Sequence, residues 1–439
     1  MLLACAACAL LPRAAFGSTD HGAEAGTLFA LTVVLLAAKL GADLAQRLRQ
    51  PAVLGELLAG VLLGNLDLLG VRAFDVVATD PMIAGLAALG VVVMLFEVGL
   101  ESTVGQMARV GGSGGLVAVL GVAAPFLLGT GVGHFLLPDQ SFYTHLFLGA
   151  ALTATSVGIT ARVLRDLGQS QTPEARVILG AAVIDDVLGL VILAAVSGII
   201  AAADAGAAAE IGPIAWIVAK AVLFLGVSVG AGVLLAPELY RRAAGLRGGG
   251  VLLGISLAFC FLLAWLSAAV GLAPIVGGFA AGLVLEGAHY KPFVDRGEQP
   301  LEELIHPVTQ FLAPVFFVLM GFRVDLGTFG NASVLGLAAA LCVAAVVGKQ
   351  LCMFGVLDRS IRRLPVGLGM VPRGEVGLIF ANIGLGLSIG GEPVVDQSTF
   401  TAVVLMVVVT TLVTPPALAW SLRRPRQPSP GGPASTDDQ

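Results

Sequence analysis

Charged residues are scarce in this chain of 439 residues, where they make up 12%, against about 25% in an ordinary soluble protein. Hydrophobic residues make up 57%, and the mean hydropathy is +0.95. This scarcity of charge excludes a soluble globular protein. We expect one all-α polytopic membrane domain embedded in lipid.

Cysteine and excess positive charge are also lacking. Of the five cysteines, Cys5 and Cys8 lie at the extreme N-terminus, while Cys260, Cys342 and Cys352 fall in apolar runs without pairing or metal-ligand spacing and are expected to pack as small hydrophobic residues. The net charge of −5 offers no basic surface, and nucleic acid is therefore excluded as a partner.

Apolar stretches long enough to cross a membrane as helices, about 20 residues each, recur along the chain. They predict about thirteen spans, near residues 27–47, 52–70, 82–100, 112–137, 143–165, 174–203, 212–236, 249–270, 272–287, 303–322, 332–356, 366–388 and 398–422. Residues 1–26 form a signal-like leader with an apolar run but no positive start. Residues 423–439 are expected to be a disordered cytoplasmic tail, without a regulatory domain.

The distribution of Lys and Arg predicts the orientation. With the N-terminus outside, seventeen of the 24 basic residues fall on the cytoplasmic side and only Arg13, Arg72 and Arg323 fall on the exterior. One missed span would remove this asymmetry. We expect an inner (plasma) membrane protein with a cytoplasmic C-terminus.

Two of the spans contain residues that interrupt a helix. The fifth contains LTATSVGIT (152–160), and the twelfth contains GLGMVPRGEVG (367–377) with Pro372 in mid-span. They lie seven spans apart and so cross in opposite directions, as matching members of an inverted repeat do. Broken segments at matching positions indicate the binding site of a transporter.

Asp185 and Asp186 lie in mid-membrane, where a carboxylate costs at least about 2.5 kcal/mol and therefore indicates function. Neighbouring helix positions differ by about 100°, so the two carboxylates need different partners. One can face the interruption, where Thr155 and Ser156 offer oxygen ligands that suit a small hard cation. Because burial disfavours a charged carboxylate, proton and cation can compete for this site.

Three further charges in the spans are candidates for neutralisation or coupling. Lys349 in the eleventh span is the best partner for the other aspartate. Arg373 and Glu375 can neutralise each other or the dipole ends of the broken helix. Glu375 can also act as a second cation ligand. A salt bridge that only holds helices together remains an alternative for the Asp–Lys pair.

Five segments resemble the bacterial monovalent cation:proton antiporters of the NapA and Kef type, with NhaA a more distant relative. They are GELLAGVLLG (55–64), MLFEVGLE (94–101), TATSVGITARVL (153–164), AAVIDDVLGL (181–190) and GMVPRGEVGLI (369–379). Their order and spacing match the family over about residues 27–422.

The resemblance implies a homodimer with two crossed discontinuous helices and an elevator movement. It implies ion-translocation helices at about 82–203 and 303–422, and dimerisation helices at about 27–70 and 212–287. By this resemblance Asp186 binds Na⁺ or the proton beside Thr155 and Ser156, Asp185 is a second candidate ligand that pairs with Lys349, and Arg373 with Glu375 belongs to the second broken helix.

Sodium or lithium exchange for protons is the function that the resemblance favours. An Asp-Asp pair with an intramembrane lysine is typical of sodium/proton exchangers, which need no cofactor besides the transported ions. A potassium/proton antiporter or a gated potassium efflux system of the Kef type is the alternative. An intramembrane aspartyl protease is excluded, since its carboxylates lie on separate helices and no GxGD segment occurs.

Overall fold

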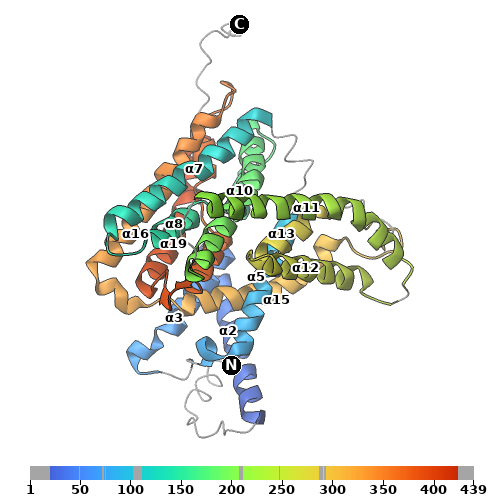
Figure 1. Ribbon diagram of the computed structural model, residues 1–439, viewed down its shortest axis with the longest axis horizontal. Coiled ribbons are helices and arrows are strands. Elements are labelled where there is room, and N and C mark those ends of the chain that lie inside the picture. Colours follow the sequence, from blue (N-terminus) through green and yellow to red (C-terminus); the bar gives the residue numbers. More distant parts are fainter. Residues whose placement is uncertain are drawn as a thin grey trace, which may run out of the picture.

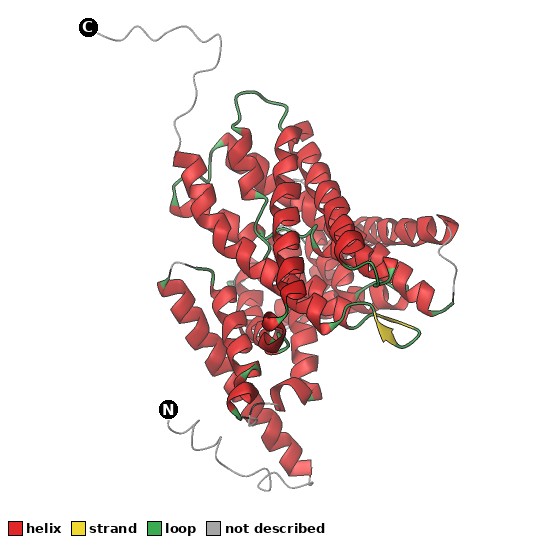
Figure 2. Cartoon of the chain, turned by 90° about the vertical axis from the view of Figure 1, so that its left-hand side faces the viewer, coloured by secondary structure: helices red, strands yellow, loops and turns green. Residues whose placement is uncertain are grey.

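The computed structural model describes residues 20–48, 50–71, 74, 76–101, 111–206, 211–246, 248–285, 290 and 293–423. Helices make up nearly all of this part, and the strands β1 (Ser388–Ile389) and β2 (Glu392–Pro393) form one short antiparallel hairpin (Figure 2). The expected helical architecture is confirmed. Residues 1–19 of the expected leader and 424–439 of the expected tail lie outside the described residues.

Within the described ranges, nine helices are long and apolar enough to cross a membrane. They are α2 (Asp20–Arg47), α5 (Pro81–Glu101), α7 (Gly111–Leu136), α10 (Pro173–Asp204), α11 (Ile211–Ala243), α12 (Val251–Ala269), α15 (Leu301–Phe322), α16 (Ala332–Leu351) and α19 (Gln397–Arg423). Each overlaps one predicted span.

The other four predicted spans contain shorter helices. Two are single helices, α3 (Ala52–Gly64) and α13 (Pro274–Val284), and two are helix pairs, α8 (Phe142–Ala151) with α9 (Val157–Asp166) and α17 (Arg363–Gly369) with α18 (Glu375–Leu385). A helix of 11 or 13 residues alone is shorter than the hydrocarbon layer. Thirteen crossings therefore stay a prediction.

Single turns of helix connect several of these elements. They are η2 (Leu66–Leu69), α4 (Val76–Thr79), η3 (Leu326–Gly330) and η4 (Cys352–Gly355).

The helices pack as two bundles (Figure 1). The scaffold bundle consists of α2, α3, α5, α12, α13 and α15, and the core bundle consists of α7 to α10 and α16 to α19. Helix α11 contacts α10 of the core and α13 of the scaffold, and so connects the two. The sequence grouped the ranges of α5 and α15 with the translocation helices, whereas in the structure they pack mainly on α3, α13 and each other.

Close backbone contact explains this packing. A Cβ added to Gly60 of α3 would lie 2.2 Å from the Val318 oxygen of α15, and one added to Gly321 would lie 2.0 Å from the Leu57 oxygen. In lipid, where hydrophobicity does not drive helices together, such small residues allow helices to pack closely. The α3–α15 pair is therefore closely packed along its backbones.

Replacing Gly321 by alanine is expected to destabilise the scaffold bundle by about 1–3 kcal/mol, because the added methyl group would overlap backbone atoms. The thermal unfolding midpoint of the purified protein in detergent measures this effect. Gly336→Ala on α16 is the control, since nothing lies within 4 Å of the added Cβ there. Equal midpoints for the two variants would contradict the expectation.

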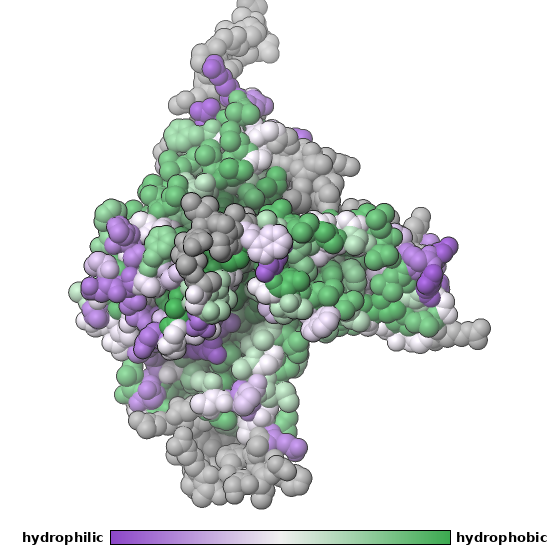
Figure 3. Space-filling view, viewed as in Figure 1, coloured by the Kyte–Doolittle hydropathy of each residue, from purple (hydrophilic) through white to green (hydrophobic). Residues whose placement is uncertain are grey.

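Hydrophobic side chains cover much of the face shown in Figure 3, and hydrophilic ones gather at its left edge and right tip. Helix α11 illustrates the pattern, since Trp216, Leu223, Leu234 and Leu235 are all exposed. Exposed large apolar side chains of this kind are suited to lipid.

Candidate ion-binding site

Both predicted interruptions are confirmed. Helix α8 ends at Ala151 and α9 begins at Val157, while α17 ends at Gly369 and α18 begins at Glu375. Local chemistry explains the breaks: the Thr153 hydroxyl donates to the Ala150 oxygen (2.7 Å), and Pro372 has no backbone N–H to donate.

The two interruptions lie against each other. The Ser156 backbone N–H donates to the Pro372 oxygen (2.8 Å), and the Thr160 hydroxyl donates to the Gly369 oxygen (2.6 Å). A Cβ added to Gly374 would lie 2.6 Å from the Ser156 hydroxyl oxygen, so a glycine is needed at this contact. Segments more than 200 positions apart in the chain thus share one polar centre.

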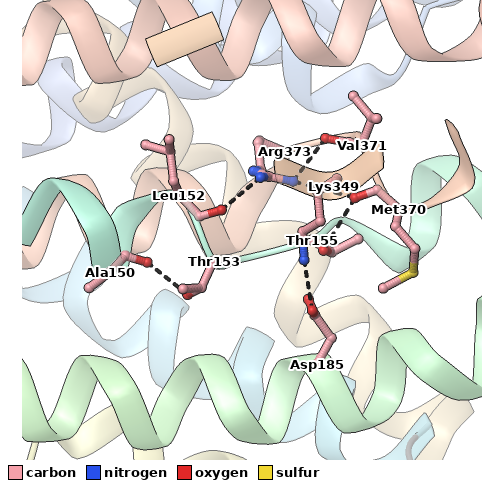
Figure 4. A network of polar contacts seen from close by, with 9 residues as sticks. All are labelled: Ala150, Leu152, Thr153, Thr155, Asp185, Lys349, Met370, Val371 and Arg373. Atoms are coloured by element: carbon pink, nitrogen blue, oxygen red, sulfur yellow. Dashed lines mark hydrogen bonds and ion pairs between the residues drawn. The ribbon is translucent and has the colours of Figure 1, made fainter. Parts of the chain in front are cut away.

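Arg373 bonds to both broken segments from a fully buried position. Its guanidinium donates to the oxygens of Leu152 (2.6 Å), Val371 (3.0 Å) and Met370 (3.4 Å), as Figure 4 shows. Interrupting a helix leaves carbonyl oxygens without their N–H partners, and a cation is the strongest donor that can replace them. Arg373 thus bonds to the carbonyl oxygens that the two helix breaks leave free.

Asp185 on α10 pairs with Lys349 on α16 (Figure 4). The distance from Lys349 Nζ to Asp185 Oδ1 is 2.7 Å, and neither side chain has any exposed surface. The Thr155 side chain lies beside the same carboxylate. The structure thus brings together the two charges that the sequence paired.

Asp186 follows on the same helix and is 5% exposed. Because the next helical position is rotated by about 100°, its carboxylate points away from the direction of Lys349. Ser156 is also buried, at the crossing of the two segments. Glu375 is the first residue of α18, and its side chain lies outside the described residues.

Three residues that the sequence reasoning missed complete this centre. A Cβ added to Gly121 of α7 would lie 3.4 Å from Asp185 Oδ1 and 3.6 Å from Lys349 Nζ, so α7 approaches the ion pair without a side chain. Thr160 and Thr411 donate hydroxyl hydrogen bonds to the oxygens of Gly369 and Arg373. Thr160 belongs to the polar run that marked the fifth span, whereas no local signal marks Gly121 or Thr411.

A cavity of about 520 Å³ separates the two bundles and extends to the crossing. Its wall includes the start of α3, Glu97 near the end of α5, and Leu167 just after α9. At the crossing it includes Ser156 and Gly374, while Asp185 and Asp186 are not among the described residues that line it. The cavity therefore extends from these helix ends to the Ser156 segment.

Apolar spanning helices, two interrupted helices in contact and charges buried beside them define a secondary transporter. Residues 30–424 match the transmembrane sodium/hydrogen exchanger family, and the chain belongs to this family. It is accordingly a multi-pass membrane protein of a family of transporters that exchange monovalent cations for protons.

Curated relatives align over nearly the whole length. The chain is 36% identical over 428 residues to the high-affinity Na⁺/H⁺ antiporter NhaS3 of Synechocystis sp., covering 90% of this chain and 89% of the relative. It is 33% identical over 398 residues to the Na⁺/H⁺-K⁺ antiporter GerN of Bacillus cereus, covering 90% and 95%. The fold is similar to that of the sodium proton antiporter MjNhaP1 of Methanocaldococcus jannaschii, with a TM-score of 0.66 at 15% identity, covering 90% and 96%.

Proposed function

We propose that this protein exports Na⁺, or Li⁺, in exchange for H⁺, with Asp186 as the residue that binds the two ions in alternation. The observation that carries the proposal is the fully buried Asp185–Lys349 pair beside the crossed segments. Lys349 already neutralises Asp185. We therefore assign Asp186, the other carboxylate at this depth, as the group that binds either the proton or the cation.

Coordination chemistry supports a small hard cation at this position. A carboxylate, hydroxyls and backbone carbonyls are the oxygen ligands that such cations prefer. Ser156 and Thr155 in the interruption offer hydroxyls, while Arg373 already holds the oxygens of Leu152, Val371 and Met370. We therefore assign Thr155 and Ser156 as ligands beside Asp186. We assign Lys349, Arg373 and Glu375 as fixed charges that, together with Asp185, sum to zero, so that the centre is neutral only when Asp186 holds a proton or a cation.

Competition at a single carboxylate gives the coupling. Asp186 must lose its proton before it binds the cation, and it must release the cation before it is protonated again. A buried carboxylate without either ion is costly, so the loaded forms are the ones that cross between the two sides. Proton entry down its gradient then drives sodium exit.

An elevator-type movement of the core bundle against the scaffold bundle accounts for access from each side. The cavity lies between these bundles, and its lining includes Pro51, Glu97 and Leu167. Each of these residues lies near a helix end whose adjoining loop is predicted to be cytoplasmic. We infer an inward-facing arrangement, with the N-terminus outside the plasma membrane. We also infer a homodimer whose contact is formed by the scaffold bundle.

Proton flux in proteoliposomes tests the substrate. We expect a pH-sensitive dye to report proton movement on addition of Na⁺ or Li⁺, and no response to choline. Choline is the control because it carries the same charge without fitting an oxygen-lined site. The absence of proton movement with every alkali cation between pH 6 and 9 would contradict the proposal.

Potassium is the second candidate cation. The relative GerN is named a Na⁺/H⁺-K⁺ antiporter, which favours keeping K⁺ in the same assay. If K⁺ alone drives proton movement, K⁺ and not Na⁺ is the transported cation, and the site assignment is unchanged.

A further inference from the structure

At the end of α15 remote from the cavity, one arginine joins the two bundles. Arg323 directly follows α15 of the scaffold, and its Nη1 donates to Asn382 Oδ1 on α18 of the core (2.7 Å). The Gln397 side-chain amide at the start of α19 donates to the Arg323 backbone oxygen. The scaffold is thus bonded to two core helices at a single residue.

The same three helices are separated at their other ends. The cavity between the bundles is bounded by Thr309 and Ala313 of α15, Leu378 of α18, and Val408 and Ala419 of α19. The cavity wall on α15 extends to Phe317, and Arg323 comes six residues later, about 9 Å along a helix. The gap between α15 and the core therefore opens toward one side of the membrane, and Arg323 closes it on the other.

The scaffold holds the Arg323 segment firmly. Asn65, which follows α3, donates through Nδ2 to the Val324 oxygen (2.7 Å) and accepts at Oδ1 from the Leu326 N–H (2.8 Å). With the tight α3–α15 contact at Gly60 and Gly321, these bonds fix the position of Arg323. A movement of the core must then break the bonds to Asn382 and Gln397 rather than carry Arg323 along.

We propose that Arg323 is a latch that closes the outer side of the transporter while the cavity side is open. The latch breaks when the core bundle moves to expose the site to the other side, and it re-forms on return. It sets the balance between the two conformations without contacting the transported ion. This inference rests on the proposed alternating access. It identifies Arg323 as the residue that stabilises the conformation in which the cavity side is open.

Cysteine accessibility in the full-length protein tests the latch. In a background whose native cysteines are replaced and whose thermal unfolding midpoint matches that of the wild type, Val408→Cys reports the cavity and Val324→Cys reports the latch side, where Val324 is 4% exposed. A membrane-impermeant maleimide is applied from the corresponding side in inverted or right-side-out vesicles. Each labelling rate is then measured with Arg323 intact and with Arg323→Gln.

Loss of one charge-assisted hydrogen bond is expected to shift the conformational equilibrium about tenfold toward the outward-facing form. Labelling of Val408→Cys should slow, and labelling of Val324→Cys should speed up. Asn382→Ala should reproduce both changes. Lys220→Gln is the matched control. Lys220 of α11 donates to the oxygen of Val270, which directly follows α12, and its replacement should change neither rate.

Two results would overturn the latch. Unchanged rates would show that Arg323 does not set the equilibrium, and rates that rise together would show a general loosening of the fold. Both readouts are independent of transport, so a wild-type protein that exchanges no cation would refute the proposed function and leave the test of the latch valid.

Discussion

Asp186→Asn is expected to abolish cation-driven proton movement, down to the level of protein-free vesicles. Asparagine keeps the size and an oxygen ligand but carries no charge and binds no proton, so it removes the competition that couples the two fluxes. The replaced carboxylate is 5% exposed and directly follows Asp185 of the buried ion pair. Dye-reported proton flux in proteoliposomes, with the sodium concentration varied, measures the loss.

Asp204→Asn is the matched control for this experiment. Asp204 is the last residue of α10, the same helix, and its side chain accepts from the Gly390 N–H (2.8 Å), a bond that an amide oxygen also makes. This variant should retain exchange. An Asp186→Asn protein that exchanges sodium for protons at the wild-type rate would falsify the assignment of Asp186.

Lys349→Ala is expected to give the largest loss of stability, about 3–5 kcal/mol, because it leaves the fully buried Asp185 carboxylate without its counter-charge. Asp185→Asn alone should also destabilise the protein, by leaving a buried ammonium group. The thermal unfolding midpoint in detergent, followed by tryptophan fluorescence, measures each variant.

The double variant Asp185→Asn with Lys349→Ala combines the two single changes and tests whether the two residues stabilise the protein as a pair. Since it removes both charges, it should be more stable than the sum of the two single losses predicts. Losses that simply add would show that each residue acts separately. Lys220→Ala, which removes a partly exposed lysine of α11, should leave the midpoint nearly unchanged.

The sequence determined the features that depend on local chemistry. Hydropathy indicates a membrane protein because lipid tolerates few charges, and Pro372 together with the Thr- and Ser-rich run at 152–160 predicts both helix breaks because each disturbs the backbone ladder. The cost of isolated charge in lipid predicts that Lys349 pairs with one of the two aspartates, and the family resemblance implies that this is Asp185, a contact across 164 positions.

Only the tertiary structure decided which helices are neighbours. A helix that is apolar all round gives no sign whether a face meets lipid or another helix, so the sequence could not place α5 and α15 with the scaffold. The Arg373 bonds to Leu152 and the Arg323 bond to Asn382 likewise depend on how distant segments cross. Hydropathy and residue type act locally, whereas the shape of the packed bundles decides these contacts.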